Sequence, residues 1–352
     1  MIVYLFIWFL LAASSIMDLI YKRLYDKRVL NLFLCILLAL FVGLRFECDN
    51  DYSTYVGHWD HLPVLYGDNI EYIYNKFSAD RLEVGYKFIA IILKSIGLSP
   101  QSMFLFCSTL TFSLFYRITP YYTRYPNIAL LIFFSQFIML PFMQIRFGVC
   151  IMLIWFSFLK WTHNEKWKAV SVYICAISFH NLAFGVLALL PLVKLKLKYL
   201  YCILAVTLII PLNFVSNLSL AIVYLMGWDY TGYFDSTDSL SYISYALNFV
   251  LILPIIIISG FRSFTIKETT LLKFYIISLI VFSLAINISI LARIAITFSI
   301  SICFILPDYM RLIRNETRYT IVILLGLIIY CALKYFPALK YFNAYNYNLK
   351  LL

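Results

Sequence analysis

Residues 29–42 read VLNLFLCILLALFV, an apolar run broken by a single asparagine. Comparable runs recur along the chain, with IALLIFFSQFIMLP at 128–141 and IVILLGLIIYCAL at 321–333. In a lipid bilayer only helices and closed barrels satisfy their own backbone hydrogen bonds. These runs are continuous and do not alternate between apolar and polar residues, so they predict membrane-spanning helices. We therefore expect an all-α, polytopic integral membrane protein, with residues 1–352 forming a single transmembrane domain.

The composition supports the same class. Of the 352 residues, 63% are hydrophobic and 13% are charged, whereas a soluble domain carries about 25% charged residues. The net charge of +11 would also suit a nucleic-acid partner. However, the basic residues gather in short clusters between apolar runs, where the orientation of the spans explains them. The expected partner is thus the lipid bilayer, and no nucleic acid.

Six basic clusters determine the expected topology. They are Lys22–Arg28, Arg117 with Arg124, Lys160–Lys168, Lys194–Lys198, Arg262 with Lys267, and Arg311–Arg318. If all of them face the cytoplasm, an even number of crossings separates each from the next. Between Arg28 and Arg117 there are three apolar segments, and the weakest, residues 84–98, holds two lysines. It is shorter than the roughly 20 apolar residues that a span needs.

We therefore predict that residues 84–98 form an amphipathic helix on the outer surface. About twelve crossings then remain, with both termini outside. Residues 46–100 become an outer loop that contains this interfacial helix, and residues 227–240 become a second outer loop. Eleven of the 17 acidic residues fall in these two loops, so the acids gather opposite the basic clusters.

Four ionisable residues lie in or beside apolar runs: Arg45, Arg146, His180 and Arg293. Such groups are unfavourable in lipid and usually face a cavity or a partner. In the expected topology all four fall at the outer ends of helices. Any one arginine could reach the lipid headgroups by snorkelling. The histidine alone could be a buried core residue whose ring nitrogens are hydrogen-bonded. A common pocket explains all four, and guanidinium groups there would bind phosphate or pyrophosphate without a metal.

The first outer loop combines acids with aromatic residues. Asp51, Tyr52 and Tyr55 follow Arg45, and Glu83 lies further along. Carboxylates bind sugar hydroxyls and aromatic rings pack on sugar faces, so this pattern is typical of a sugar-binding site. Without further support, an ordinary solvated loop explains the same residues. The loop lacks the glycine and the closing glutamate of a calcium-binding loop, so no metal is expected.

The order of these motifs resembles the EpsG-like family of bacterial polysaccharide polymerases. GLR at 43–45 is followed by DYSTY at 51–55 and EVGY at 83–86. An arginine then opens a helix at 146, SFH at 178–180 ends the next helix, and the late Arg293 precedes a helix ending in Pro307. One departure is Val84, where many relatives carry proline.

Members of this family look like Wzy-type O-antigen polymerases, similar in architecture to the GT-C glycosyltransferases and the O-antigen ligases. The resemblance implies a metal-independent glycosyltransferase without a cofactor, multi-pass in the bacterial inner membrane, with its active site facing the periplasm. Its substrate would be an oligosaccharide repeat unit on undecaprenyl pyrophosphate, with a polysaccharide chain-length regulator as a further partner. A flippase (transporter) for the same lipid-linked oligosaccharide, or an O-antigen ligase, is the alternative function.

The expected roles of the site residues follow from this chemistry. Arg146 and Arg293 would hold the leaving pyrophosphate, while Arg45 would assist them or fix the loop. His180 would act as general base, since an imidazole titrates near neutrality. Asp51 or Glu83 is the alternative base, in which case His180 would bind phosphate.

Overall fold

The structure, a computed structural model, describes residues 2–21, 23–66, 69–79, 82–209, 242–259, 264–284, 289–312, 317–339 and 348–349. The described part is mostly helical, which confirms the predicted all-α class. The chain divides into two compact units, the first made of Met1–Ala183 and Leu306–Leu352, the second of Phe184–Ile305. The expected loop at 227–240 lies outside the described residues.

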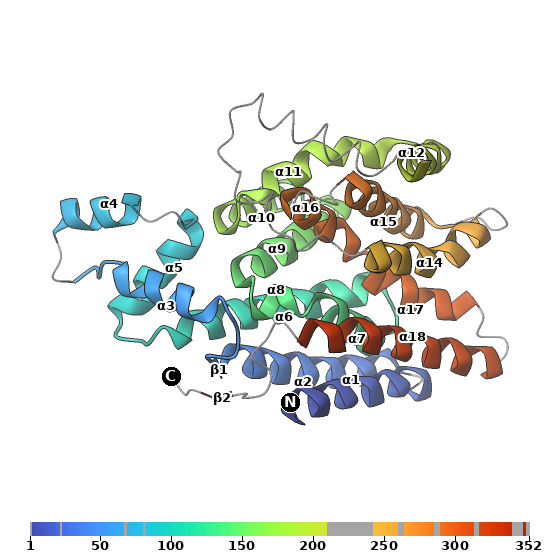
Figure 1. The fold of residues 1–352 in the computed structure, drawn as a ribbon, viewed down its shortest axis with the longest axis horizontal. Helices are drawn as coiled ribbons and strands as arrows, with labels where there is room; N and C mark the ends of the chain where they lie inside the picture. The colour runs from blue at the N-terminus through green and yellow to red at the C-terminus, as the bar shows by residue number, and fades with distance from the viewer. Residues whose placement is uncertain are drawn as a thin grey trace. The chain divides into compact units, whose positions relative to one another are not determined.

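The first unit contains most of the helices (Figure 1). They are α1 (Ile2–Ile20), α2 (Leu24–Gly43), α3 (Tyr52–His61), α4 (Ile70–Ala79), α5 (Val84–Ser95), α6 (Gln101–Tyr122), α7 (Pro126–Phe137), α8 (Met139–Phe142), α9 (Ile145–Thr162), α10 (Lys166–Phe179) and α18 (Thr317–Ala338). The second unit holds η1 (Leu190–Lys194), α12 (Leu197–Ile209), α14 (Tyr242–Ser259), α15 (Ile266–Leu284) and α16 (Ser289–Ser299). Helices α11 (Leu182–Leu189) and α17 (Ile302–Leu312) continue from one unit into the other.

Several helices have the length and composition of membrane spans. Within the part of the chain that the structure describes, four segments are long and apolar enough to cross a bilayer, namely Ile2–Ile20, Ile145–Thr162, Leu291–Asp308 and Ile321–Ala338. Shorter apolar helices accompany them, at Pro126–Phe137, Leu182–Lys194, Leu197–Thr207 and Asn248–Ile257. The chain is therefore a multi-pass membrane protein. The count of about twelve crossings stays a prediction.

Small side chains bring α2 and α6 into close antiparallel contact. Ser108 Oγ on α6 donates to the backbone oxygen of Ala39 on α2, at 2.8 Å. A Cβ atom on Gly43 would lie 2.8 Å from Cα of Leu105 and 2.5 Å from Ser108 Oγ. Glycine at this position therefore allows the end of α2 to pack directly on the backbone of α6.

A second set of polar contacts joins the start of α2 to the end of α1 and the start of α7. Asp18 at the end of α1 accepts hydrogen bonds from the backbone nitrogens of Asn127 at 2.8 Å and Ile128 at 3.0 Å. These are the first amides of α7, which have no partner within their own helix and attract negative charge. Lys27 on α2 donates to the backbone oxygen of Asp18, which closes the network.

The only strands in the described residues form a two-stranded antiparallel sheet, β1 (Arg45–Phe46) with β2 (Asn348–Leu349). Arg45 pairs with Leu349, so the C-terminal strand lies at the same end of the first unit as Arg45. The hydroxyl of Tyr335 donates to the backbone oxygen of Tyr4 at 3.0 Å, which brings the start of α1 beside the end of α18. This arrangement agrees with both termini being on one side of the membrane, and which side that is stays a prediction.

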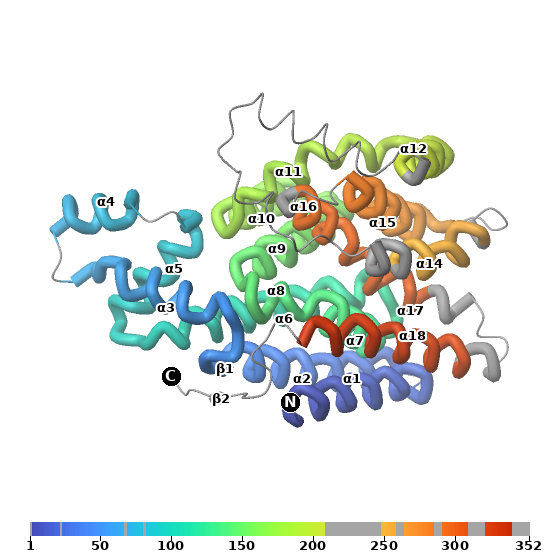
Figure 2. Tube along the Cα trace, in the orientation of Figure 1, coloured from blue at the N-terminus to red at the C-terminus, as the bar shows by residue number. Residues whose placement is uncertain are grey.

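Helix α5 differs in length from the expected surface helix. It spans Val84–Ser95 and therefore ends before the predicted residue 98, because Gly97 takes a φ of +83° and closes the helix. Lys94 donates to the backbone oxygens of Trp59 at 2.8 Å and Leu62 at 2.5 Å, at the end of α3. The chain thus folds back on itself through α3, α4 and α5 (Figure 2). Whether α5 lies in the membrane interface is still a prediction.

The second unit centres on α15, which packs against α12, α14 and α16. Lys273 Nζ donates to the backbone oxygen of Val193 in η1 at 2.9 Å. The hydroxyl of Tyr275 donates to the backbone oxygen of Asn248 in α14 at 3.1 Å. Long polar side chains on an otherwise apolar helix therefore find backbone acceptors inside this unit.

Candidate active site

Three of the residues singled out in the sequence meet in the first unit. Glu83 immediately precedes α5, Arg146 lies in the first turn of α9, and His180 follows the end of α10. One carboxylate oxygen of Glu83 forms an ion pair with Nη1 of Arg146, and the other lies 3.7 Å from Nδ1 of His180. An acid, a guanidinium group and an imidazole are thus gathered from three helix ends.

Gly85 is responsible for this meeting. A Cβ atom at Gly85 would fall on the hydroxyl of Ser178 and 2.8 Å from the backbone oxygen of the same serine. Because glycine has no side chain, α5 approaches the end of α10 closely. The point of approach is Ser178, two residues before His180. The glycine of the EVGY motif therefore fixes Glu83 beside the histidine.

His180 is held on two sides. Its Nδ1 accepts a hydrogen bond from the backbone nitrogen of Leu182 at 3.2 Å, and its ring lies against Phe147, with 5.2 Å between the ring centres. When the ring is neutral, this bond favours the tautomer with the proton on Nε2. Nδ1, which faces both Leu182 and Glu83, is then the atom that takes up a proton.

Aromatic rings surround the guanidinium group of Arg146. Its central carbon lies 5.7 Å from the ring centre of Tyr55 and 5.8 Å from that of Tyr86. Both tyrosines are buried, and burial raises the pKa of the Tyr55 hydroxyl, although the charge of Arg146 partly opposes this. Rings on two sides orient the guanidinium group and lower its exposure to water.

The group is open to a ligand. The side chains of Arg146, Glu83 and His180 are 21%, 10% and 15% exposed. Within the described residues, Nε of Arg146 is buried and has no hydrogen-bond partner. A phosphate oxygen that enters from outside would therefore meet the exposed part of the Arg146 side chain and not Nε.

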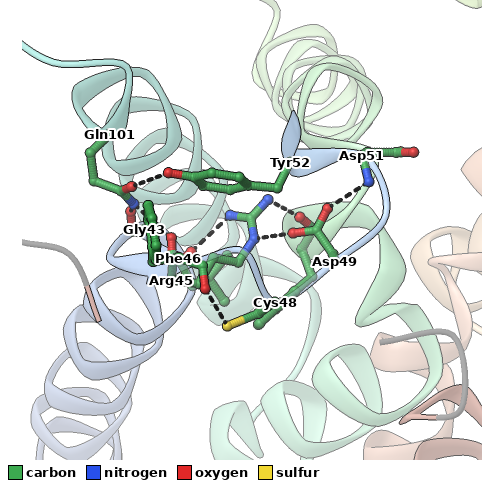
Figure 3. A network of polar contacts seen from close by, with 10 residues as sticks. Gly43, Arg45, Phe46, Cys48, Asp49, Asp51, Tyr52 and Gln101 are labelled. Carbon is green, nitrogen blue, oxygen red and sulfur yellow. Dashed lines mark hydrogen bonds and ion pairs between the residues drawn. The ribbon is translucent and has the colours of Figure 1, made fainter. Parts of the chain in front are cut away.

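Arg45 lies in a separate, fully buried network (Figure 3). Its Nε donates to Asp49 Oδ2 at 2.7 Å, its Nη1 to the backbone oxygen of Val42 at 2.8 Å, and its Nη2 to the backbone oxygen of Phe142. The rings of Phe104 and Phe142 lie 4.7 and 4.9 Å from its central carbon. Of the two roles expected for Arg45, this environment favours fixing the loop over binding pyrophosphate.

Tyr52 and Gln101 extend this network. The Tyr52 hydroxyl donates to Gln101 Oε1 at 3.1 Å, and Gln101 Nε2 donates to the backbone oxygens of Gly43 at 2.5 Å and Arg45 at 2.9 Å. The Tyr52 ring stacks on Phe104 with 4.8 Å between ring centres, and burial raises the pKa of its hydroxyl to about 12. Tyr52 therefore packs the loop against α6, and its sugar-binding role stays a prediction.

Sequence reasoning missed Asp49 and Gln101 as members of the site. Asp49 stands four residues after Arg45, but this segment is not helical, so the spacing did not indicate the ion pair. Gln101 is a polar residue at the start of an apolar helix. Its position in the sequence does not indicate that its side chain bonds to Gly43, Arg45 and Tyr52.

Asp51 joins the Arg45 network through its backbone, whereas Arg293 belongs to the second unit. The backbone nitrogen of Asp51 donates to Asp49 Oδ1 at 3.0 Å, and its carboxylate points away from Arg45 in Figure 3. Arg293 lies in α16 of the second unit and is half-buried. The sugar-binding role of Asp51 and the phosphate-binding role of Arg293 stay predictions.

Among the described residues, no group of three or more His, Cys, Asp or Glu side chains is arranged to hold a metal ion.

Comparison with known proteins gives a family match: the model of the EpsG family covers residues 28–349. No curated protein and no solved structure matches the chain.

Proposed function

Because the chain belongs to the EpsG family of Wzy-like polysaccharide polymerases, we propose that it polymerises O-antigen, or a similar surface polysaccharide, from repeat units carried on undecaprenyl pyrophosphate. The growing glycan leaves its lipid carrier and is transferred to the terminal sugar of a new lipid-linked unit. The transfer takes place at the periplasmic face of the bacterial inner membrane. A chain-length regulator as a partner belongs to the same proposal.

One observation supports this chemistry most directly. Glu83 lies between Arg146 and His180, so a phosphate-binding cation and two proton acceptors share one partly exposed site. Glycosyl transfer from a pyrophosphate needs both kinds of group, one to stabilise the leaving anion and one to accept the hydroxyl proton.

The reaction proceeds as an inverting displacement. The acceptor hydroxyl oxygen forms a bond to the anomeric carbon, and the bond from that carbon to the pyrophosphate oxygen breaks. The lipid pyrophosphate leaves with the electron pair, and the partly exposed guanidinium group of Arg146 stabilises its charge. Arg293 is the second arginine in this role. The hydroxyl proton passes to the base.

His180 is the first choice for that base and Glu83 is the second. Nδ1 of His180 and the carboxylate of Glu83 lie 3.7 Å apart, so both candidate bases belong to the same site. The histidine is preferred because the carboxylate of Glu83 is already engaged in the ion pair with Arg146. A substrate phosphate competes with Glu83 for Arg146 and thereby releases the carboxylate from that pair.

The proposal is tested in a strain that lacks the gene and carries variants of it. R146A and H180A should leave the acceptor lipid with single repeat units, whereas R124A, which removes an arginine from a distant turn of the first unit, should restore the full polysaccharide ladder. A ladder of normal length in both R146A and H180A would overturn the assignment.

The same strain separates the alternative functions. Loss of a ligase would leave long polymer on the lipid carrier, and loss of a flippase would leave single lipid-linked units with no sugar at the surface. Loss of the polymerase alone yields a surface acceptor that bears one repeat unit. Either of the first two patterns in the deletion strain contradicts the proposed function.

A further inference from the structure

A groove of about 480 Å³ runs between α2 and α6. Large and small apolar residues of both helices line it, together with Ser113 and Arg117 of α6. Its lining is apolar apart from two small hydroxyl residues, one tyrosine and one arginine.

The shape of the groove follows from the spacing of large and small residues. Leu32, Ile36 and Leu40 recur every four residues along α2, and they are 40%, 53% and 43% exposed. The buried Cys35 and Ala39 form the floor beside them. In a membrane protein an exposed apolar stripe of this kind faces lipid, and the small floor residues leave room for a chain to lie between the helices.

One end of the groove is positively charged. Arg117 lines it from α6, and Arg28 precedes Leu32 by one turn on the same stripe of α2. Because Ser108 on α6 bonds to Ala39 on α2, the two antiparallel helices place both arginines toward the same end. None of the ion pairs among the described residues involves either arginine, whereas Lys160 and Lys168 both pair with Glu165.

We propose that this groove binds an anionic phospholipid from the leaflet that meets the basic turns. Arg117 and Arg28 hold the phosphate, and one acyl chain lies along the apolar stripe. Ser113 lies one turn inside Arg117, which is the depth of the glycerol ester groups, and its exposed hydroxyl donates to an ester carbonyl.

Two other occupants suit the groove less well. A transmembrane helix of a partner would bury Arg117 and would need an acid of its own to pair with it. The pyrophosphate of the polymerisation substrate belongs near Arg146, where α9 begins, while the charged end of the groove lies at the end of α6 that is opposite to Gln101 and Arg45. The phospholipid site is therefore distinct from the proposed catalytic site.

The test uses the purified full-length protein in a neutral detergent. Its unfolding midpoint is measured with added phosphatidylglycerol and, separately, with phosphatidylcholine of the same chain length. We expect phosphatidylglycerol to raise the midpoint and phosphatidylcholine to leave it unchanged. R117Q should weaken phosphatidylglycerol binding about fivefold, as expected for one surface charge, and R124Q, the same change at the same end but outside the groove, should bind like wild type.

A second variant fills the groove without removing charge. S113L places a large apolar side chain on a lipid-facing position, so the protein should fold while phosphatidylglycerol no longer raises the midpoint. Native mass spectrometry should find one retained anionic phospholipid in wild type and none in S113L. Equal effects of the two lipids on wild type would overturn the proposal, as would equal binding in R117Q and R124Q, or retention of a polyprenyl phosphate in place of the phospholipid.

Discussion

Arg45 and Asp49 form an ion pair in which neither side chain is exposed to solvent, with Nε and Oδ2 at 2.7 Å. The pair lies where α2 ends and the loop to α3 begins, and the arginine also bonds to the backbone oxygen of Phe142, just before α9. The start of the loop that leads to Tyr55 is thereby tied to the helix end that carries Arg146. These contacts favour a structural role for the arginine of the GLR motif, which would hold the loop against the segment that precedes α9.

The first prediction concerns this pair. D49N and R45M should each lower the free energy of unfolding by about 3–5 kcal/mol, because each leaves a buried polar or charged partner uncompensated. The double variant R45M/D49L should lose less than the sum of the single variants, since it removes both charges together. Unfolding in detergent micelles measures all three. Should D49N unfold like wild type and fail only in polymerisation, Arg45 would have to bind substrate directly.

Glu83 is the subject of the second prediction. E83Q keeps the shape of the side chain but removes the charge that faces Arg146 and His180, and it should reduce polymerisation by about 100-fold or more, the usual effect of losing an acid–base group. The rate of chain extension with purified protein and lipid-linked units measures this. E165Q is the matched control, because it also breaks pairs with basic residues, Lys160 and Lys168, in an exposed turn. An equal loss in both variants would show a general effect on folding or insertion.

The third prediction uses the glycines. G85A forces Cβ against the backbone of Ser178, so it should lower stability by about 1–3 kcal/mol and should also lower activity by moving Glu83 from His180. G57A is the control: nothing lies within 4 Å of a Cβ at Gly57, and alanine inside helix α3 should raise stability by about 0.5–1 kcal/mol. Thermal unfolding and chain extension are compared for both. Normal activity in G85A would separate the EVGY motif from catalysis.

Much of the fold was predictable from the sequence because membrane spans depend on local composition. The apolar runs at 29–42 and 321–333 lie within α2 and α18, and a helix begins at Val84 as expected. The end of that helix was not predicted, because it depends on the positive φ of Gly97. The network around Asp18 was also missed, since it requires knowing that α7 begins beside the end of α1.

The site was predictable only in part, and for a related reason. The cost of a charge in lipid singled out Arg45, Arg146 and His180, but it gave no indication of which charges touch. The contact between Glu83 and His180 depends on the close approach of Gly85 to Ser178, and Arg45 reaches Phe142, which is 97 positions away in the chain. Such contacts arise from tertiary packing, so a single sequence does not reveal them.

The fourth prediction is a pH effect. Burial raises the pKa of Tyr52 from 10.0 to about 12, so the folded protein holds this proton more tightly than the unfolded chain does. The protonated Tyr52 hydroxyl therefore contributes to the free energy of unfolding fully below pH 10. This contribution is lost as the pH rises toward 12, because the tyrosine ionises first in the unfolded state. Y52F should therefore lose less stability between pH 9 and pH 12 than wild type does. Parallel curves for the two proteins in that range would contradict the assignment.

The last prediction concerns the orientation of the first unit in the membrane. Tyr66 lies between α3 and α4, and Lys94 of α5 donates to the carbonyl groups of Trp59 and Leu62 just before it. Glu165 follows α9, which begins at the Arg146 end and is long enough, at about 27 Å, to cross the hydrocarbon core. Alkaline phosphatase fused after Tyr66 should be active outside the cytoplasm, and green fluorescent protein fused after Glu165 should fluoresce inside. A fusion after Leu352 should behave like the one after Tyr66, because β2 pairs with β1 beside Arg45. If the reporters after Tyr66 and Glu165 report the same compartment, α9 does not cross the membrane and the proposed periplasmic site is wrong.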